Sequence, residues 1–379
     1  MHIPTRFPDL APRRALRASL ALSLLAGALT VSLVPDRAAA QAAAQKDAKP
    51  KVEKEPTGET QVPALFTSET PLAITFRTNI RQLRRDKQDE APWRWAAVTY
   101  QDSAGKSVEV PLRARTRGIW RLKHCEFPPV RFNFAAKDTK GTIFEGVDKP
   151  KIVNYCKDSD QYEQYVLQEA QLYRAYRLLT PVSHRVRVAR MSYVDSASGK
   201  RDSERWAILL EDPDQMANRN MAKITEIKGA GPADLEQKEF ALAYMFLFLI
   251  GNLDFSFSGL HNTELVTTTD GRVLPVLYDF DYSGAVNATY AVPPPNYNVP
   301  NVRTRKFLAP CELAPEFPSA VAALVEQKDA IYALYRDDIG KLLNPSVVRS
   351  TLEYFDDFYE QVRTPQEAER NVFRKCVRR

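Results

Sequence analysis

The stretch Phe240–Asn262, FALAYMFLFLIGNLDFSFSGLHN, runs from the most apolar part of the chain directly into a loop with Asp254 and His261. The apolar residues cover most faces of a helix, which predicts a central buried helix over 235–252. A buried carboxylate without a partner is costly or shifts its pKa. The polar residues that follow the helix therefore need a partner, and a metal ion is one candidate.

A second polar segment follows shortly afterwards. The sequence VLYDFDYSG at 276–284 places Asp279 directly after an apolar run. The Asp-Gly pair at 270–271 is a strong turn signal and predicts a hairpin between the two polar segments. Because the two ends of a hairpin meet, we expect Asn262 and Asp279 to face one spot near Asp254.

These side chains are the set that phosphoryl transfer uses: an Asp to orient or deprotonate the acceptor hydroxyl, and an Asn and an Asp to hold Mg²⁺. In this interpretation Asp254 is catalytic, and Asn262 and Asp279 bind the metal. A structural interpretation stays open, in which Asp254 and Asn262 cap loops and Asp279 and Asp281 are turn residues. So does a metal-dependent hydrolase that uses Asp254, Asp279 and Asp281 as ligands to two metal ions.

The rest of the folded chain divides into a sheet-rich and a helix-rich half. Alternating and β-branched runs predict strands within 65–156 and a hairpin over 185–211. Apolar residues at helical spacing predict one inserted helix over 159–179. The later pattern is mainly helical. We therefore expect an α+β protein with a sheet-rich N-lobe over 63–212 and a helical C-lobe over 213–379.

The N-terminus has the order of a secretory signal peptide over 1–40. Several Arg residues precede the apolar run at 19–34, and three Ala follow at 38–40. The apolar run is shorter than the roughly 20 residues of a membrane span, although an uncleaved anchor stays an alternative. Residues 41–62 have no aromatic residue, which predicts a disordered linker. We expect an exported protein, periplasmic or extracellular, with no membrane association after signal cleavage.

The net charge and the cysteine content bear on three features: nucleic-acid binding, disulfides and a zinc site. The first 40 residues hold five Arg and two Asp, so their removal lowers the formal net charge from +6 to +3, which gives little reason to expect nucleic acid. An even number of Cys in an exported chain allows two disulfides. Proximity in the sequence favours Cys125–Cys156 and Cys311–Cys376, while four free thiols stay the alternative. The Cys spacing does not fit a zinc site.

Several segments resemble the spore-coat CotH-type kinases, an atypical protein-kinase family. They are RTRGIWRLKHCEFPPVRFNF (115–134), RVRVARMSYVDSASGKRDSERWAILLED (185–212), GNLDFSFSGLHN (251–262) and YDFD (278–281). The resemblance covers most of the chain after the N-terminal segments. It implies a two-lobed, atypical protein-kinase-like fold that binds ATP with Mg²⁺ or Mn²⁺ between its lobes.

The resemblance also assigns site residues. It implies Asp254 as the catalytic residue and Asn262 and Asp279 as metal ligands. Seven residues separate Asp254 from Asn262 where the usual kinase order has four, and Ile119-Trp120 stand where the family has Asn and small hydroxyl residues. The expected cofactor-binding residues are Lys151, with Glu169 as its ion-pair partner, Arg131 and Glu211.

The function that follows from the resemblance is an exported, ATP- and Mg²⁺-dependent kinase. Its expected partner is a protein substrate with Ser or Thr hydroxyls. Two alternatives stay open. One is a non-catalytic, pseudokinase-like structural or assembly protein of the cell envelope, and the other is the metal-dependent hydrolase described above.

Overall fold

The structure is a computed structural model that describes residue 56 and residues 62–88 and 91–378. All of these residues belong to one compact unit, which runs from Lys54 to Arg379. The expected signal peptide over 1–40 and nearly all of the expected linker over 41–62 lie outside the described residues.

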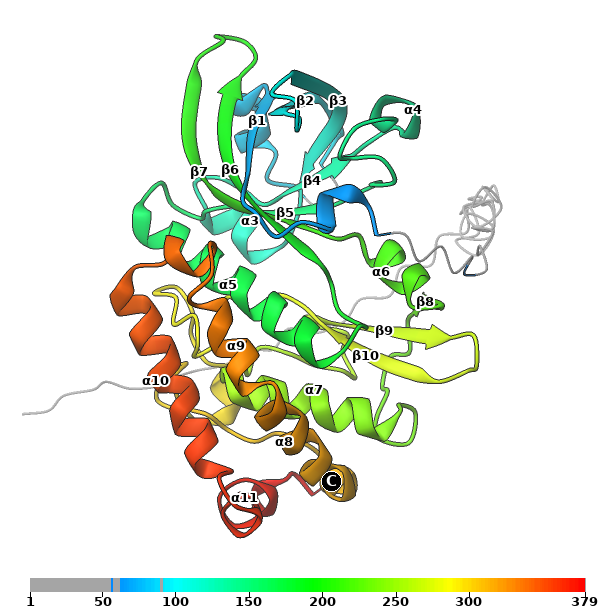
Figure 1. Cartoon of the computed structure of the whole chain (residues 1–379), viewed down its shortest axis with the longest axis vertical. Coiled ribbons are helices and arrows are strands. Elements are labelled where there is room, and N and C mark those ends of the chain that lie inside the picture. Colours follow the sequence, from blue (N-terminus) through cyan, green and yellow to red (C-terminus); the bar gives the residue numbers. More distant parts are fainter. Residues whose placement is uncertain (1–55, 57–61, 89–90, 379) are drawn as a thin grey trace, which may run out of the picture. The chain divides into compact units, whose positions relative to one another are not determined.

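Seven strands between residues 72 and 210 close into a barrel (Figure 1), in the order β1-β2-β3-β4-β5-β7-β6. Neighbouring strands are antiparallel except for β1 and β6, which are parallel, with Leu72 opposite Ala189. This parallel pair closes the barrel. The strands are β1 (Leu72–Thr78), β2 (Arg94–Gln101), β3 (Ser107–Thr116), β4 (Val130–Asn133), β5 (Lys151–Val153), β6 (Val186–Asp195) and β7 (Arg201–Leu210).

The two-lobed, protein-kinase-like fold expected from the sequence is therefore wrong, because a closed barrel is not the N-lobe of that fold. The error lies in strand pairing. Alternation along β1 shows that Ile74, Phe76 and Thr78 point inward, but it does not show that β1 lies beside β6, which follows after more than a hundred residues. The coarser expectation of a mixed α+β protein is confirmed.

Aromatic side chains fill the interior of the barrel. The ring of Phe76 lies 4.9 Å from that of Phe132, and the ring of Phe127 lies 4.6 Å from that of Tyr193. All four side chains are fully buried. Their size lets a small closed barrel pack without a channel, as interiors with few voids require.

Helices and a small second sheet make up the remainder. The three-stranded sheet has the order β10-β9-β8. Its strands are β8 (Ala222–Thr225), β9 (Thr263–Thr268) and β10 (Val273–Leu277). The α-helices are α2 (Ile80–Arg85), α3 (Trp120–His124), α4 (Ala136–Thr139), α5 (Asp160–Leu179), α6 (Pro213–Arg219), α7 (Gln237–Ile250), α8 (Phe317–Glu326), α9 (Lys328–Leu334), α10 (Pro345–Gln361) and α11 (Pro365–Asn371). Short 3₁₀ helices occur at Ala64–Phe66, Pro295–Tyr297, Cys311–Glu316, Gly340–Leu342 and Phe373–Lys375.

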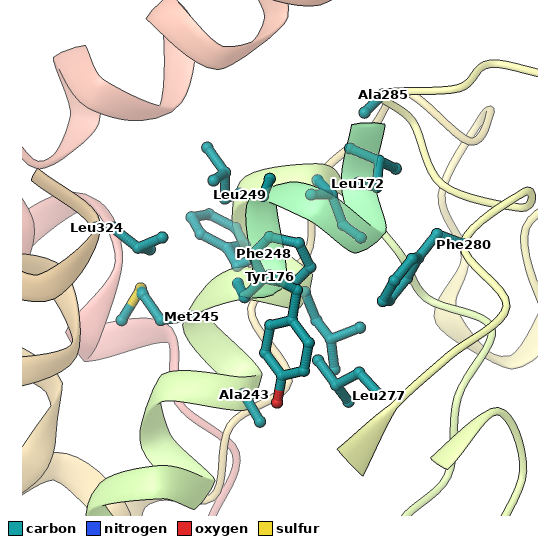
Figure 2. Packing of buried hydrophobic residues seen from close by; sticks show 14 of the residues in the cluster. Leu172, Tyr176, Ala243, Met245, Phe248, Leu249, Leu277, Phe280, Ala285 and Leu324 are labelled. Carbon is teal, nitrogen blue, oxygen red and sulfur yellow. The ribbon is translucent and has the colours of Figure 1, made fainter. Parts of the chain in front are cut away.

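Helix α7 is the central buried helix that the sequence predicts. Every residue from Phe240 to Ile250 is buried. Figure 2 shows α7 packed against Leu172 and Tyr176 of α5, with Leu324 of α8 nearby. The helix ends at Gly251, whose φ of 64° lies in the left-handed region that favours glycine. This rigid end positions the loop that follows.

Two disulfides join distant parts of the chain, Cys125–Cys156 and Cys311–Cys376. Both pairings expected from the sequence are confirmed. The first links the end of α3 to the segment after β5, and the second links the start of a 3₁₀ helix to the C-terminal segment. Among the described helices, no helix combines the length and apolar character that a membrane crossing requires.

Candidate functional site

Asp254 lies on the loop between α7 and β9, and neighbouring polar groups hold it in place. Its Oδ1 is 3.0 Å from Nε2 of His261, and its Oδ2 accepts a hydrogen bond of 3.1 Å from Nδ2 of Asn262. The same Nδ2 donates to the main-chain oxygen of Asp254 at 2.8 Å. The carboxylate is still 28% exposed. It is thus oriented and accessible at the same time.

The ends of the β9–β10 hairpin bring Asp279 to the same place. Thr263 and Leu277 form the last strand pair, and the N–H of Tyr278 donates to the main-chain oxygen of Asn262 at 3.2 Å. Asn262 and Asp279 both have φ values in the left-handed region, 52° and 62°. Asn and Asp accept this conformation more readily than other residues with a side chain. The structure therefore brings the ends of the hairpin together, as expected.

Tyr282 links the two carboxylates electrostatically. Burial, followed by the charges of Asp281, Asp254 and Asp279, raises the pKa of Tyr282 to about 12. Asp254 and Asp279 thus both raise the pKa of the same phenol group. The main-chain N–H of Asp279 donates to the hydroxyl of Tyr173 on α5 at 2.8 Å, which anchors this turn against the helix.

A buried acidic group lies behind Asp279. Glu169 on α5 is 1% exposed, and burial, followed by the charges of Asp281 and Asp279, raises its pKa well above the ordinary value. Burial and then the charge of Asp279 raise the pKa of Asp281 to about 8. The hydroxyl of Tyr290 donates to Oδ2 of Asp281 at 2.9 Å. Proximity makes it costly for all three carboxylates to carry a charge together.

Two arginines of the segment 115–134, called here the Arg-Gly segment, face these acids. Nη1 of Arg121 lies 3.9 Å from Oδ2 of Asp281, and its Nη2 donates to the main-chain oxygen of Asn154. Burial lowers the pKa of Arg117, and the charge of Asp279 opposes that effect. The Nε atoms of Arg117 and Arg121 are buried and have no hydrogen-bond partner among the described residues. Such orphaned donors favour an anionic ligand.

Lys151 pairs with Glu264 and not with Glu169. Its Nζ lies 3.3 Å from Oε1 of Glu264 on β9 and 4.6 Å from the ring centre of Tyr278. Burial lowers the pKa of Lys151, although the charge of Glu264 opposes this. Oε2 of Glu264 lies 3.2 Å from Nε2 of the buried His184. Glu169 instead interacts with Arg121 and Arg117, so the expected Lys151–Glu169 pair does not form.

Arg131 and Glu211 are engaged elsewhere. Nη2 of Arg131 donates to Oδ2 of Asp212 at 3.0 Å. The buried carboxylate of Glu211 accepts hydrogen bonds from the side chain of Arg219 and from the main-chain N–H of Arg185. Within the described part of the chain, no hydrogen bond or ion pair joins Arg131 or Glu211 to the group around Asp254.

Sequence reasoning missed the roles of several residues at this place. Arg117 and Arg121 lie in the Arg-Gly segment, so their basic character was a usable signal. Glu264 lies two residues after Asn262, which places both side chains on one face if the strand continues. Nothing in the sequence around His184 indicated a role at this site, because its burial beside β9 depends on the fold. The missed residues are Arg117, Arg121, His184, Glu264 and Tyr290.

The acidic residues alone do not form a metal centre. Residues 62–88 and 91–378 contain no group of three or more His, Cys, Asp and Glu side chains placed to hold a metal ion. A cation near Asp279 would therefore take further oxygen ligands from Asn262, from the main chain or from a bound phosphate.

An exposed aromatic surface adjoins the carboxylates. The ring of Trp120 on α3 stacks on His124 at 4.5 Å and lies 6.0 Å from Tyr282 and 5.6 Å from Tyr290. Trp120 is 39% exposed and its neighbour Ile119 is 79% exposed. The segment that departs from the CotH-type pattern thus presents apolar side chains beside the candidate site.

No protein-family model matches the chain, and no curated protein matches it. The resemblance to the CotH-type kinases therefore rests on the quoted segments alone.

Proposed function

We propose that this protein transfers a phosphoryl group from ATP to a Ser or Thr hydroxyl of a protein substrate, with Mg²⁺ or Mn²⁺ as cofactor. One observation carries the proposal. The hydrogen bonds from Asn262 to Asp254 lie at the end of the hairpin that also carries Asp279. One Asp near the acceptor, with an Asn and an Asp for the cation, is the arrangement that phosphoryl transfer uses.

The residues at this place are chemically suited to a nucleotide with a divalent cation. Nδ2 of Asn262 is used by Asp254, while its Oδ1 accepts no hydrogen bond from the described residues. That oxygen and the carboxylate of Asp279 are the hard ligands that Mg²⁺ prefers. The orphaned Nε atoms of Arg117 and Arg121 are donors for phosphate oxygens.

Each residue then has a defined task. Asp254 accepts the proton of the acceptor hydroxyl while the hydroxyl oxygen forms a bond to the γ-phosphorus. The bond from that phosphorus to the bridging oxygen breaks, and ADP leaves with the electron pair. Arg117 and Lys151 supply positive charge for the phosphates. A bound Mg²⁺, held by Asn262 and Asp279, would neutralise negative charge on the phosphates.

We also propose that the protein works outside the cytoplasm. Two disulfides support this location, since such bonds persist mainly in oxidising compartments. The basic and apolar order of residues 1–40 gives separate support. ATP is scarce outside the cytoplasm. The assay for transfer to an acceptor therefore needs a separate test that the protein binds the nucleotide.

Radiolabelled ATP tests the transfer. Wild type with Mg²⁺ and a mixed protein substrate should incorporate label. Asp254→Asn and Asp279→Asn should each reduce incorporation by about a hundredfold or more. Asp270→Asn is the matched control, because Asp270 lies exposed at the tip of the same hairpin. Label that persists in both site variants would contradict the assignment.

One observation favours a non-catalytic alternative, an envelope assembly protein. Both carboxylate oxygens of Asp254 already have partners inside the protein, as a loop cap would. Thermal unfolding distinguishes the two. A ligand at 100 times its Kd stabilises by about 2.7 kcal/mol, so a shift with ATP and Mg²⁺ that Asp279→Asn removes supports the nucleotide site. Absence of any shift in the wild type supports the alternative.

A further inference from the structure

A polar pocket lies on the barrel between α2 and the turn that joins β6 to β7. Its volume is about 530 Å³, within the range of small-molecule sites. Five of the residues that line it are basic: Arg81, Arg84, Arg85, Lys200 and Arg201. Arg81 is three and four residues before Arg84 and Arg85, so these like charges lie on one helix face and repel one another.

The carboxylates of the pocket do not neutralise all of this charge. Asp202 pairs with Arg84 through both oxygens, at 3.0 and 2.8 Å. Asp195 accepts hydrogen bonds from the main-chain N–H groups of Ile80 and Ser198 and from the hydroxyl of Ser198. Both acids are therefore already engaged in local contacts.

Three cations remain without an acceptor. Arg201 pairs with Glu204 at 3.0 Å. The side chains of Arg81, Arg85 and Lys200 donate no hydrogen bond to any acceptor in the described part of the chain, and all three are exposed. A pocket with three uncommitted cations favours a multiply charged anion over a single carboxylate.

This pocket is separate from the candidate site around Asp254. Lys151 of that site lies opposite Leu210, at one end of β7, whereas Arg201 is at the other end. Ten strand residues at about 3.3 Å each span roughly 30 Å. Figure 1 shows the β6–β7 turn pointing away from α5, which carries Glu169. A ligand in the pocket would not touch Asp254, Asp279 or the acids beside them.

We propose that this pocket binds a phosphate group, either of an anionic lipid or of a soluble phosphate compound. A phosphate monoester carries a charge of about −1.5 to −2, and the phosphodiester of an anionic lipid carries a single negative charge, so the excess of positive charge in the pocket attracts either group. Guanidinium groups bind phosphate oxygens through paired hydrogen bonds, and two of the three uncommitted cations are Arg. The inference is independent of the function proposed for the carboxylates.

Binding by the full chain tests the proposal with two probes. Calorimetry measures affinity for inorganic phosphate, and sedimentation measures binding to phosphatidylglycerol-containing vesicles against vesicles of phosphatidylcholine alone. Combined replacement of Arg81, Arg85 and Lys200 by Gln should weaken binding by at least about tenfold for whichever of the two probes the wild type binds. The matched control replaces three exposed cations elsewhere, Lys106, Arg336 and Arg349, by Gln and should bind like wild type.

Asp202→Asn provides a gain that unfolding cannot mimic. It releases Arg84 from its partner, so affinity should rise about threefold or more. Binding of inorganic phosphate identifies a soluble source, and binding of phosphatidylglycerol vesicles alone identifies a lipid headgroup; both support the pocket. The proposal is overturned if neither probe binds, if the triple variant binds like wild type, or if the control variant loses affinity equally.

Discussion

Lys151 on β5 and Glu264 on β9 form an ion pair, with 3.3 Å between Nζ and Oε1, and this contact joins the barrel to the three-stranded sheet. Both side chains are largely buried, with 13% and 17% exposed. Burial would raise the pKa of Glu264, but the hydrogen bond with His184 and the charge of Lys151 outweigh it and hold the pKa at about 2. The pair therefore fixes the hairpin that carries Asn262 and Asp279 against the barrel.

Glu264→Gln should destabilise the protein strongly. It leaves the ammonium group of Lys151 in a buried position without a carboxylate, which costs about 3–5 kcal/mol. Urea unfolding at neutral pH measures the loss. The double variant Lys151→Met/Glu264→Leu should recover most of it, because an apolar pair of similar volume removes the unpaired charge. A double variant as unstable as Glu264→Gln would show that the pair itself supplies the stability.

Gly251 should tolerate no side chain. Its φ is positive, and a Cβ there would collide with the hydroxyl oxygen of Tyr354 on α10. Gly271, in the β9–β10 turn, also has a positive φ but has open space around it. Gly271→Ala should therefore cost about 1 kcal/mol from backbone strain alone. Gly251→Ala should cost about 2 kcal/mol more, since overpacking adds to the strain.

Urea midpoints of the two glycine variants check this difference. Gly251→Ala should also displace the loop with Asp254 and thus lower nucleotide binding, whereas Gly271→Ala should not. Equal costs at the two glycines would mean that Tyr354 moves aside freely.

Both disulfides should stabilise the protein, but only one of them should affect nucleotide binding at the candidate site. They close segments of 31 and 65 residues, so each should contribute about 3–4 kcal/mol, with the longer one slightly more. Replacing Cys311 and Cys376 by Ser should lower the thermal midpoint only. Replacing Cys125 and Cys156 should also weaken nucleotide binding, because α3 carries Arg121. Retained affinity in the second variant would exclude a role for this bond in positioning Arg121.

Local features of the sequence predicted the elements around the candidate site. Helix α7 follows from a run that is apolar on most faces, and the Asp-Gly pair at 270–271 predicts the hairpin. These signals depend only on residues that are neighbours along the chain, so they can be recognised in a single sequence. The meeting of Asp254 with Asn262 follows from the same local geometry.

Long-range partners were beyond that reasoning. Glu264 follows Lys151 by 113 residues, whereas Glu169 is much nearer in sequence and lies in the expected helix. Burial pattern and charge cannot choose between two carboxylates without the fold. The parallel pairing of β1 with β6, which closes the barrel, was not predicted for the same reason. Alternation specifies the inward face of a strand but not its neighbour.

Asp337 provides a test of pH dependence away from the candidate site. Burial would raise its pKa, but hydrogen bonds from Arg174 and from the main-chain N–H of Gly340 outweigh this and hold the pKa below the ordinary value of 3.8. A group whose pKa is lower in the folded state stabilises it above the ordinary pKa and loses that effect as pH falls. Asp337→Asn should therefore cost about 2 kcal/mol at neutral pH.

The cost of Asp337→Asn should shrink as the pH falls below the ordinary carboxyl pKa, because the protonated wild-type carboxyl then resembles the amide. Urea unfolding of both proteins from neutral pH down to about pH 3 measures this convergence. Asp338→Asn is the neighbouring control: the Asp338 side chain is 76% exposed and forms an ion pair with Lys341 at the surface, so the change should alter stability by less than about 0.5 kcal/mol at any pH. A cost for Asp337→Asn that stays constant across the range would mean that shape, and not the charge facing Arg174, holds this segment against α5.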